Sequence, residues 1–157
     1  MTFLMDQNKI AELINRYVAV SFTVNKKAES LIKAEIGDEL TNDQHYILRY
    51  IYRSGGCTST ELADAFEVNK SAITAYTNRM VDRDLIKRRR DEGDRRVIYL
   101  TLTDTGNNLF EKTEEKVLAL VESIITRFDE MEIQHFLQTY EKLAEILLKM
   151  KMDQLED

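Results

Sequence analysis

The sequence contains no proline, a single cysteine and only five glycines among its 157 residues. One cysteine cannot form a disulfide within the chain, which is consistent with a reducing compartment. No apolar run approaches the length of a membrane-spanning helix, and the N-terminus lacks the basic and apolar regions of a signal peptide. We therefore expect a cytoplasmic protein with no membrane segment.

Patterns of catalytic and metal-binding residues are also missing. We find no set of nucleophile, base and acid, no glycine-rich loop for a phosphate and no cluster of metal ligands. The two histidines, His45 and His135, are interpreted as capping or packing residues. Cys57 is interpreted as an inert, partly buried thiol. The sequence predicts neither an enzyme nor a bound cofactor or metal.

The composition is that of a soluble globular protein, with 43% apolar and 32% charged residues. The length suits one domain with a modest extension, and an all-helical chain of this size often adds a partner. The glycines fall where periodic segments stop, so we interpret them as boundaries between elements. They are Gly37, Gly55, Gly56, Gly93 and Gly106.

Helical periodicity and N-capping patterns predict six helices. Asp6 and Asn69 are expected N-caps, and capping boxes are expected to begin at Thr41, Thr58 and Asp129. The helices are predicted over 6–35, 41–53, a short stretch from 58, about 70–83, from 103 to about 127, and from 129 to about 152.

Between the fourth and fifth helices the pattern changes to extended runs. Strands are predicted near 85–90 and 97–102, joined by the Asp-Glu-Gly-Asp turn at 91–94. Two short helices followed by a hairpin are the order of a winged helix-turn-helix. We therefore expect a mainly α fold with a small two- to three-stranded antiparallel sheet.

The positive charge is concentrated in one part of the chain. The net charge is −6, yet residues 69–96 carry nine Lys or Arg and five Asp or Glu, leaving 13 basic and 23 acidic residues elsewhere. Six of the 22 basic residues lie within 87–96. Phosphate neutralisation depends on local charge, so an acidic chain can still bind nucleic acid. Taken alone, the run at 87–90 is equally well explained as a solvated strand face.

The second short helix is expected to enter the DNA major groove, because its exposed face has small and hydrogen-bonding side chains. The residues expected to read bases are Ser71, Ala72, Thr74, Ala75 and Asn78. Those expected to contact the DNA backbone are Lys70, Arg79, Arg88, Arg90 and Arg95. Arg96 is expected to enter the minor groove, and Asp94 to pair with an arginine and fix its geometry.

The string DEGDRRVIYLTLTDTG at 91–106 resembles the wing signature of the MarR (multiple antibiotic resistance regulator) family. The matching residues are Asp94, Arg95, Arg96, Leu102, Thr103 and Gly106. The upstream stretches LTNDQHYILRYI and TSTELADAFEVNKSAITAYTNRMVDRDLIKR are also similar to the family pattern. The resemblance extends over the whole chain, including the long terminal helices.

This resemblance implies a homodimeric DNA-binding protein, usually a repressor, whose dimer interface is formed by the terminal helices. It implies one MarR-like domain over 1–157, with a winged helix-turn-helix lobe at about 37–103 and dimerisation helices at about 6–35 and 104–152. A small aromatic or phenolic effector is often bound in this family. Tyr17, Tyr46 and Tyr50 are candidates to line its site, although aromatic residues at helical spacing are more often core.

Dimerisation is also suggested by the residues themselves. The apolar stripes at 10–24 and 133–150 are too wide to cover one monomer's core. The function expected is that of a ligand-responsive repressor on a pseudo-palindromic operator. Two alternatives remain at this point: a winged-helix protein-interaction module without specific DNA binding, and an enzyme.

Overall fold

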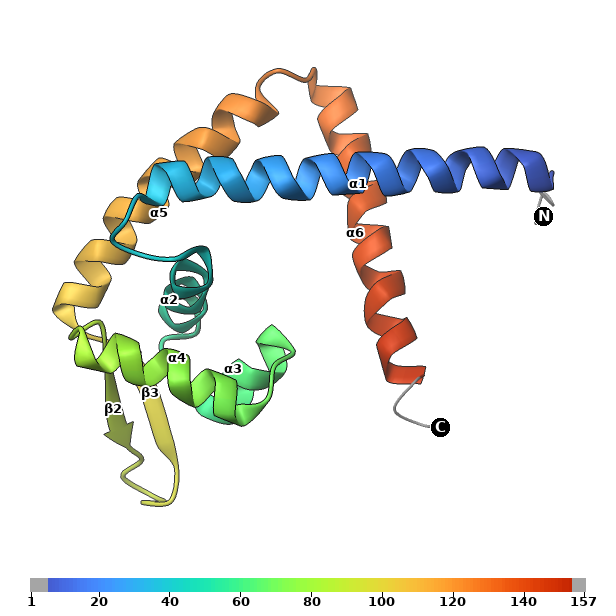
Figure 1. The fold of residues 1–157 in the computed structure, drawn as a ribbon. Helices are drawn as coiled ribbons and strands as arrows, with labels where there is room; N and C mark the ends of the chain where they lie inside the picture. The colour runs from blue at the N-terminus through green and yellow to red at the C-terminus, as the bar shows by residue number, and fades with distance from the viewer. Residues whose placement is uncertain (1–5, 154–157) are drawn as a thin grey trace. The chain divides into compact units, whose positions relative to one another are not determined.

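The computed structural model describes residues 6–153 and is mostly helical, as expected (Figure 1). The elements in chain order are α1 (Gln7–Ile36), α2 (Asn42–Ser54), β1 (Cys57–Thr58), α3 (Ser59–Phe66), α4 (Lys70–Asp82), β2 (Ile86–Arg90), β3 (Ile98–Leu102), α5 (Asp104–Ile125) and α6 (Glu130–Asp153). The chain divides into two compact units, one ending at Val117 and the other beginning at Leu118.

The predicted helix starts are confirmed, because each expected capping residue makes its hydrogen bond. Thr41 and Thr58 form complete capping boxes with Gln44 and Glu61. Asp129 accepts from the Glu132 backbone N–H at 2.9 Å, and its own N–H donates to the Glu132 carboxylate at 3.1 Å. These side chains satisfy backbone N–H groups that a helix leaves without partners in its first turn.

The hydrophobic core of the first unit lies between α2, α3, α4 and the sheet. Its largest fully buried side chains include Leu48, Leu62, Ile73, Met80 and Leu100. They come from every element of the helix-turn-helix and from β3, so the lobe is held together by one shared core. This core fixes α4 against the hairpin.

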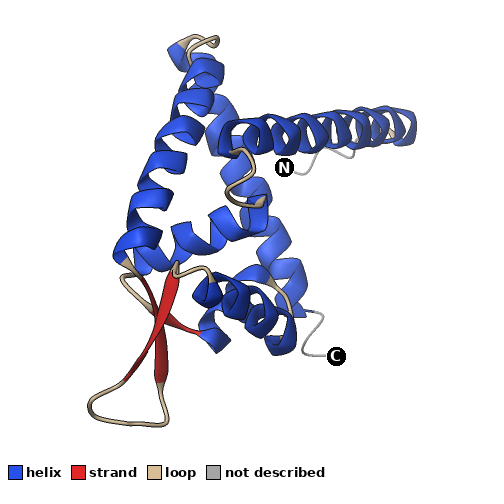
Figure 2. Cartoon of the chain, turned by 60° about the vertical axis from the view of Figure 1, so that its left-hand side comes forward, coloured by secondary structure: helices blue, strands red, loops and turns tan. Residues whose placement is uncertain are grey.

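The sheet has three antiparallel strands in the order β1-β3-β2. The β2–β3 hairpin was predicted, and the view in Figure 2 shows it extending from the helices as a wing. The strand β1 was not predicted. Cys57 pairs with Leu100 and Thr58 with Tyr99, in a segment too short for an alternating pattern to be visible in the sequence.

Gly106, in the first turn of α5, packs directly against the backbone that precedes β2. A Cβ at this position would lie 2.0 Å from the Leu85 carbonyl oxygen, so only glycine permits the observed approach. Thr103 completes the junction: its N–H donates to the Leu85 carbonyl at 3.1 Å and its hydroxyl to the Asp84 carbonyl at 2.5 Å. The Leu-Thr-x-x-Gly motif at 102–106 therefore packs the start of α5 against the start of the wing.

The long helices carry most of the exposed apolar surface. Residues 7–35 of α1 contain no buried side chain, and neither does the second unit between Leu118 and Met150. The exposed apolar residues of α1 include Leu13, Tyr17 and Val24. Within the part of the chain that the structure describes, no helix has both the length and the apolarity to cross a bilayer.

Candidate nucleic-acid interface

The outer face of α4 contains the side chains that were predicted to contact DNA. Ile73, Thr77 and Met80 point into the core, and the helix is thereby held with its opposite side toward solvent. Ala72 is half-buried, and the other predicted residues of this helix are exposed: Lys70, Ser71, Thr74, Ala75, Asn78 and Arg79. Asn69 caps the helix through a 2.8 Å bond from the Ala72 N–H to its side-chain oxygen.

Two of these polar side chains already have partners within the protein. The Thr74 hydroxyl donates to the Lys70 carbonyl at 2.8 Å, so its proton is used inside the helix. The Asn78 side-chain oxygen accepts a hydrogen bond from the Arg88 guanidinium. Ser71 has no such partner among the described residues and keeps its full hydrogen-bonding capacity.

The register of the hairpin separates the arginines of β2 onto two faces. Arg88 lies opposite Leu100 and Arg90 opposite Ile98, on the same face as the buried Ile86. Arg89 lies on the other face, opposite Tyr99, with its guanidinium carbon 5.7 Å from the centre of the tyrosine ring. Arg88 and Arg90, the two strand arginines predicted to contact DNA, thus share the face that packs on α4.

The tip of the wing is organised by two aspartates. Asp91 accepts a bond from the Asp94 N–H at 3.0 Å, which closes the turn. Asp94 accepts from the Arg96 backbone N–H at 3.0 Å and from its guanidinium at 3.1 and 3.2 Å. The Arg90 guanidinium donates to the Arg95 carbonyl at 3.1 Å and supports the other side of the loop.

The hydrogen bonds from Arg96 lower the pKa of the Asp94 carboxyl below its ordinary value. The sequence predicted that Asp94 would pair with an arginine, and the structure identifies Arg96 as that partner. The fork of the guanidinium is held by both carboxylate oxygens, while the Arg96 side chain stays 91% exposed.

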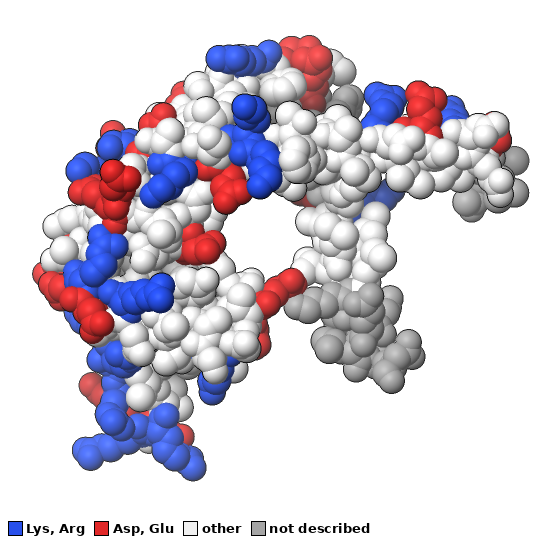
Figure 3. Space-filling model, in the orientation of Figure 1, with Lys and Arg blue, Asp and Glu red and all other residues white. Residues whose placement is uncertain are grey.

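Positive charge gathers at the free end of the hairpin, at the lower left of Figure 3. The exposed basic side chains of the whole hairpin are Lys87, Arg88, Arg89, Arg90, Arg95 and Arg96. Arg83, also in the basic segment, has a structural role instead. It donates to the Glu39 carbonyl at 2.5 Å and to the Gln44 side chain at 3.4 Å, tying the end of α4 to the start of α2.

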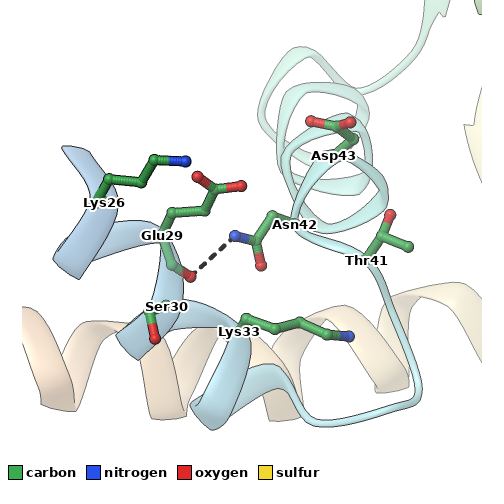
Figure 4. A pocket seen from close by; sticks show the side chains of 7 residues that line it. All are labelled: Lys26, Glu29, Ser30, Lys33, Thr41, Asn42 and Asp43. Carbon is green, nitrogen blue, oxygen red and sulfur yellow. Dashed lines mark hydrogen bonds between the residues drawn. The ribbon is translucent and has the colours of Figure 1, made fainter. Parts of the chain in front are cut away.

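The three candidate effector-site tyrosines differ in their surroundings. Tyr17 and Tyr46 are 54% and 42% exposed. Tyr50 is half-buried, with its ring edge-on to Phe66. A surface cavity of about 460 Å³ lies between α1 and the start of α2. The Asn42 side chain donates to the Glu29 carbonyl at 3.1 Å beside it (Figure 4). None of the three tyrosines lines this cavity.

A buried polar cluster joins α2 to α5. The sequence predicted a capping or packing role for His45 but not its partners on α5. The His45 side chain is fully buried, with Nδ1 3.1 Å from the Thr113 hydroxyl and Nε2 3.0 Å from the Glu114 carboxylate. Arg49 binds the other oxygen of Glu114 at 3.3 Å. Burial lowers the pKa of His45, and the Glu114 hydrogen bond opposes this effect only in part.

Cys57 is buried, more fully than the sequence suggested, and burial raises the pKa of its thiol to about 11. At neutral pH the thiol is therefore protonated and a poor nucleophile. Among the described residues, no group of three or more His, Cys, Asp or Glu side chains is arranged to hold a metal ion.

Fold and interface together define a winged helix-turn-helix protein with an exposed recognition helix and an arginine-rich wing. Residues 39–97 match the model of the MarR family. The chain is 31% identical over 128 residues to the uncharacterised HTH-type transcriptional regulator YpoP of Bacillus subtilis, covering 77% of this chain and 89% of YpoP. This chain belongs to the MarR family, and it is a DNA-binding transcriptional regulator rather than an enzyme.

Two further similarities agree with this assignment. The HTH-type transcriptional repressor MdtR of Bacillus subtilis is 30% identical over 116 residues, with 72% of this chain and 75% of MdtR covered. The crystal structure of Streptococcus pneumoniae FabT in complex with DNA superposes with a TM-score of 0.74 at 22% identity, covering 89% of this chain and 99% of FabT. At that identity the likeness shows the fold alone.

Proposed function

We propose that the chain is a homodimeric repressor that binds a pseudo-palindromic operator through α4 and the wing. One observation carries this proposal. The exposed face of α4 lies together with Arg88 and Arg90 of β2, and these two arginines are next to the charged wing tip. In such a complex α4 lies in the major groove and the wing tip follows the adjacent minor groove.

The residues divide by role according to their chemistry. Ser71, Ala72, Thr74, Ala75 and Asn78 form the surface that approaches the base edges. Lys70, Arg79, Arg88, Arg90 and Arg95 supply positive charge to the DNA backbone. Arg96, oriented by Asp94, enters the minor groove, where a narrow A·T-rich segment has an enhanced negative potential.

Homodimerisation is supported by the exposed apolar stripes. The 30-residue α1 has no buried side chain before Ile36, and the second unit has none between Leu118 and Met150, so both present apolar faces that favour association. A second copy of the chain supplies matching apolar surface. In this arrangement 1–157 acts as one MarR-like domain, with the lobe at about 37–103 and dimerisation helices at about 6–35 and 104–152; residues 1–5 and 154–157 lie outside the described part.

The proposal also includes repression of transcription and release of the DNA when an effector binds. Repression is supported by the name of MdtR, a transcriptional repressor. A small aromatic or phenolic molecule is the proposed effector, and the exposed rings of Tyr17 and Tyr46, together with Tyr50, are its proposed contacts. Such a molecule acts only if it binds the DNA-competent and DNA-incompetent dimers with different affinity. A panel of phenols and benzoates tested for release of bound DNA examines this step.

The experiment that tests the proposal is a titration of the purified chain with the DNA upstream of its own gene, over a series of salt concentrations. Unrelated DNA serves as the competitor. Binding that resists the competitor, with log K falling steeply as log salt rises, is expected of a specific regulator. A flat response to salt would instead favour a protein-interaction module. If binding is salt-dependent but is lost to the competitor, selection from random duplexes determines whether the operator lies elsewhere.

A further inference from the structure

Among the described residues, one side-chain hydrogen bond joins the exposed face of the recognition helix to the wing, between Asn78 and Arg88. Asn78 lies on the exposed face of α4, and its side-chain oxygen accepts a hydrogen bond from the Nη2 group of Arg88 in β2. Neither side chain has another hydrogen-bond partner among the described residues. The strand face that bears Arg88 is fixed by the pairing of β2 with β3, and the helix face by the core residues of α4.

The contact changes what Asn78 can do. An asparagine that reads adenine uses its oxygen and its amide nitrogen together, as an acceptor and a donor on one base edge. In this chain Arg88 occupies one of the two acceptor positions of that oxygen, so a paired contact with adenine would have to share the oxygen with the guanidinium. The guanidinium, by contrast, has five N–H donors and uses one of them on Asn78. The remaining donors are free for a phosphate.

We propose that Asn78 is a positioning residue, which holds the Arg88 guanidinium at the junction of helix and wing so that Arg88 contacts a DNA phosphate. This inference rests on the proposed DNA-binding function and assigns Asn78 a role other than direct base reading. An arginine side chain loses rotamer freedom when it binds, and a partner that fixes it beforehand reduces this cost. The same contact makes the recognition helix and the wing one continuous binding surface.

Arg89 offers a matched control, because it is the neighbouring arginine on the same strand. Its side chain lies on the opposite face, over Tyr99, and makes no contact with Asn78. Removing Arg88 or Arg89 changes the net charge equally. Only the removal of Arg88 takes away the partner of Asn78.

The test uses the full chain and the duplex that the wild-type protein selects from a random-sequence pool. Affinities are measured by fluorescence anisotropy for wild type, Asn78→Ala, Arg88→Ala, Arg89→Ala, and Asn78→Ala combined with each arginine variant. We expect Arg88→Ala to lower affinity by about tenfold and to make the salt dependence less steep by about one unit per chain. Asn78→Ala is expected to lower affinity by roughly three- to tenfold and to leave the selected sequence unchanged.

The decisive comparison is between the two double variants. In the Arg88→Ala background, Asn78→Ala is expected to have almost no further effect, whereas with Arg89→Ala the two losses multiply. Multiplying losses in both backgrounds, or an Asn78→Ala protein that selects a different base at one position, would overturn the inference while leaving the proposed function intact. Failure of the wild-type chain to select any duplex would overturn both. Thermal unfolding of each variant checks that the exposed substitutions leave the fold unchanged.

Discussion

The Asp94 carboxylate holds the Arg96 guanidinium through both of its oxygens, from Nε to Oδ1 at 3.1 Å and from Nη2 to Oδ2 at 3.2 Å. The same carboxylate accepts the Arg96 backbone N–H at 3.0 Å. A carboxylate at a DNA-facing tip reduces the attraction for phosphate. The carboxylate is explained if orienting the Arg96 guanidinium strengthens DNA binding more than the reduced positive charge weakens it.

Two substitutions separate the role of the Arg96 side chain from that of the carboxylate that orients it. Arg96→Ala is expected to weaken binding to the operator by about 1–3 kcal/mol per half-site, because the side chain proposed to enter the minor groove is gone. Asp94→Asn leaves the arginine in place but removes the charged partner that orients it, and we expect it to weaken binding as well. Both are measured by anisotropy titration against wild type.

The sign of the Asp94→Asn effect is informative, because simple electrostatics predicts the opposite. The variant is more positive by one charge, so a wing that acts only by attracting phosphate would bind DNA more tightly. Tighter binding of Asp94→Asn would contradict the positioning role of the carboxylate. Unchanged affinity of Arg96→Ala would remove the wing tip from the mechanism.

Gly106→Ala is expected to destabilise the protein by about 1–3 kcal/mol, because the added methyl group overlaps the Leu85 carbonyl oxygen. Gly93→Ala is the matched control: a Cβ there meets only the Asp91 side chain, at an ordinary 3.4 Å. Urea unfolding followed by circular dichroism measures both. Equal stability of the two variants would show that α5 does not need its close approach to Leu85.

The buried His45 makes stability depend on pH in a defined direction. Burial lowers the pKa of His45 in the folded protein, so below the unfolded-state value of about 6.5 the unfolded chain binds more protons than the native one. The free energy of unfolding therefore falls as the pH drops below that value, and continues to fall until the folded pKa is reached. The contribution of His45 is fully present above the unfolded pKa.

Denaturant unfolding of wild type and His45→Gln at a series of pH values isolates this contribution, because all other titrating groups are shared. Wild type is expected to lose more stability on acidification than the variant. A larger loss for His45→Gln would mean that the imidazolium is favoured in the folded state, with the Glu114 carboxylate outweighing the burial of the ring.

Leu13→Asp is expected to raise the dissociation constant of the proposed dimer at least tenfold, because a charge placed in an apolar interface is costly to desolvate. Asn15→Asp makes the same charge change about 200° further round the helix, away from the apolar stripe, and should leave the dimer intact. Sedimentation over a range of concentrations measures both. Equal behaviour of the two variants would place the dimer interface elsewhere.

Much of the fold could be predicted because its signals are local. The capping boxes at Thr41 and Thr58 lie within four residues of chain, and the hairpin turn within a similar span. The contacts that could not be predicted join residues far apart in sequence: His45 with Glu114, and Asn78 with Arg88. Periodicity shows which side of an element is buried, but not which side chain on another element will face it.

The most direct test of the central claim is a hydroxyl-radical footprint of the chain on the duplex that it selects. If α4 of each copy lies in a major groove and each wing tip in a minor groove, the footprint shows two half-sites about 10 base pairs apart, each flanked by minor-groove protection. In Arg96→Ala the flanking protection is expected to disappear, while protection at the centres of the two half-sites remains. A single uninterrupted protected stretch, or flanks that persist in Arg96→Ala, would contradict the account.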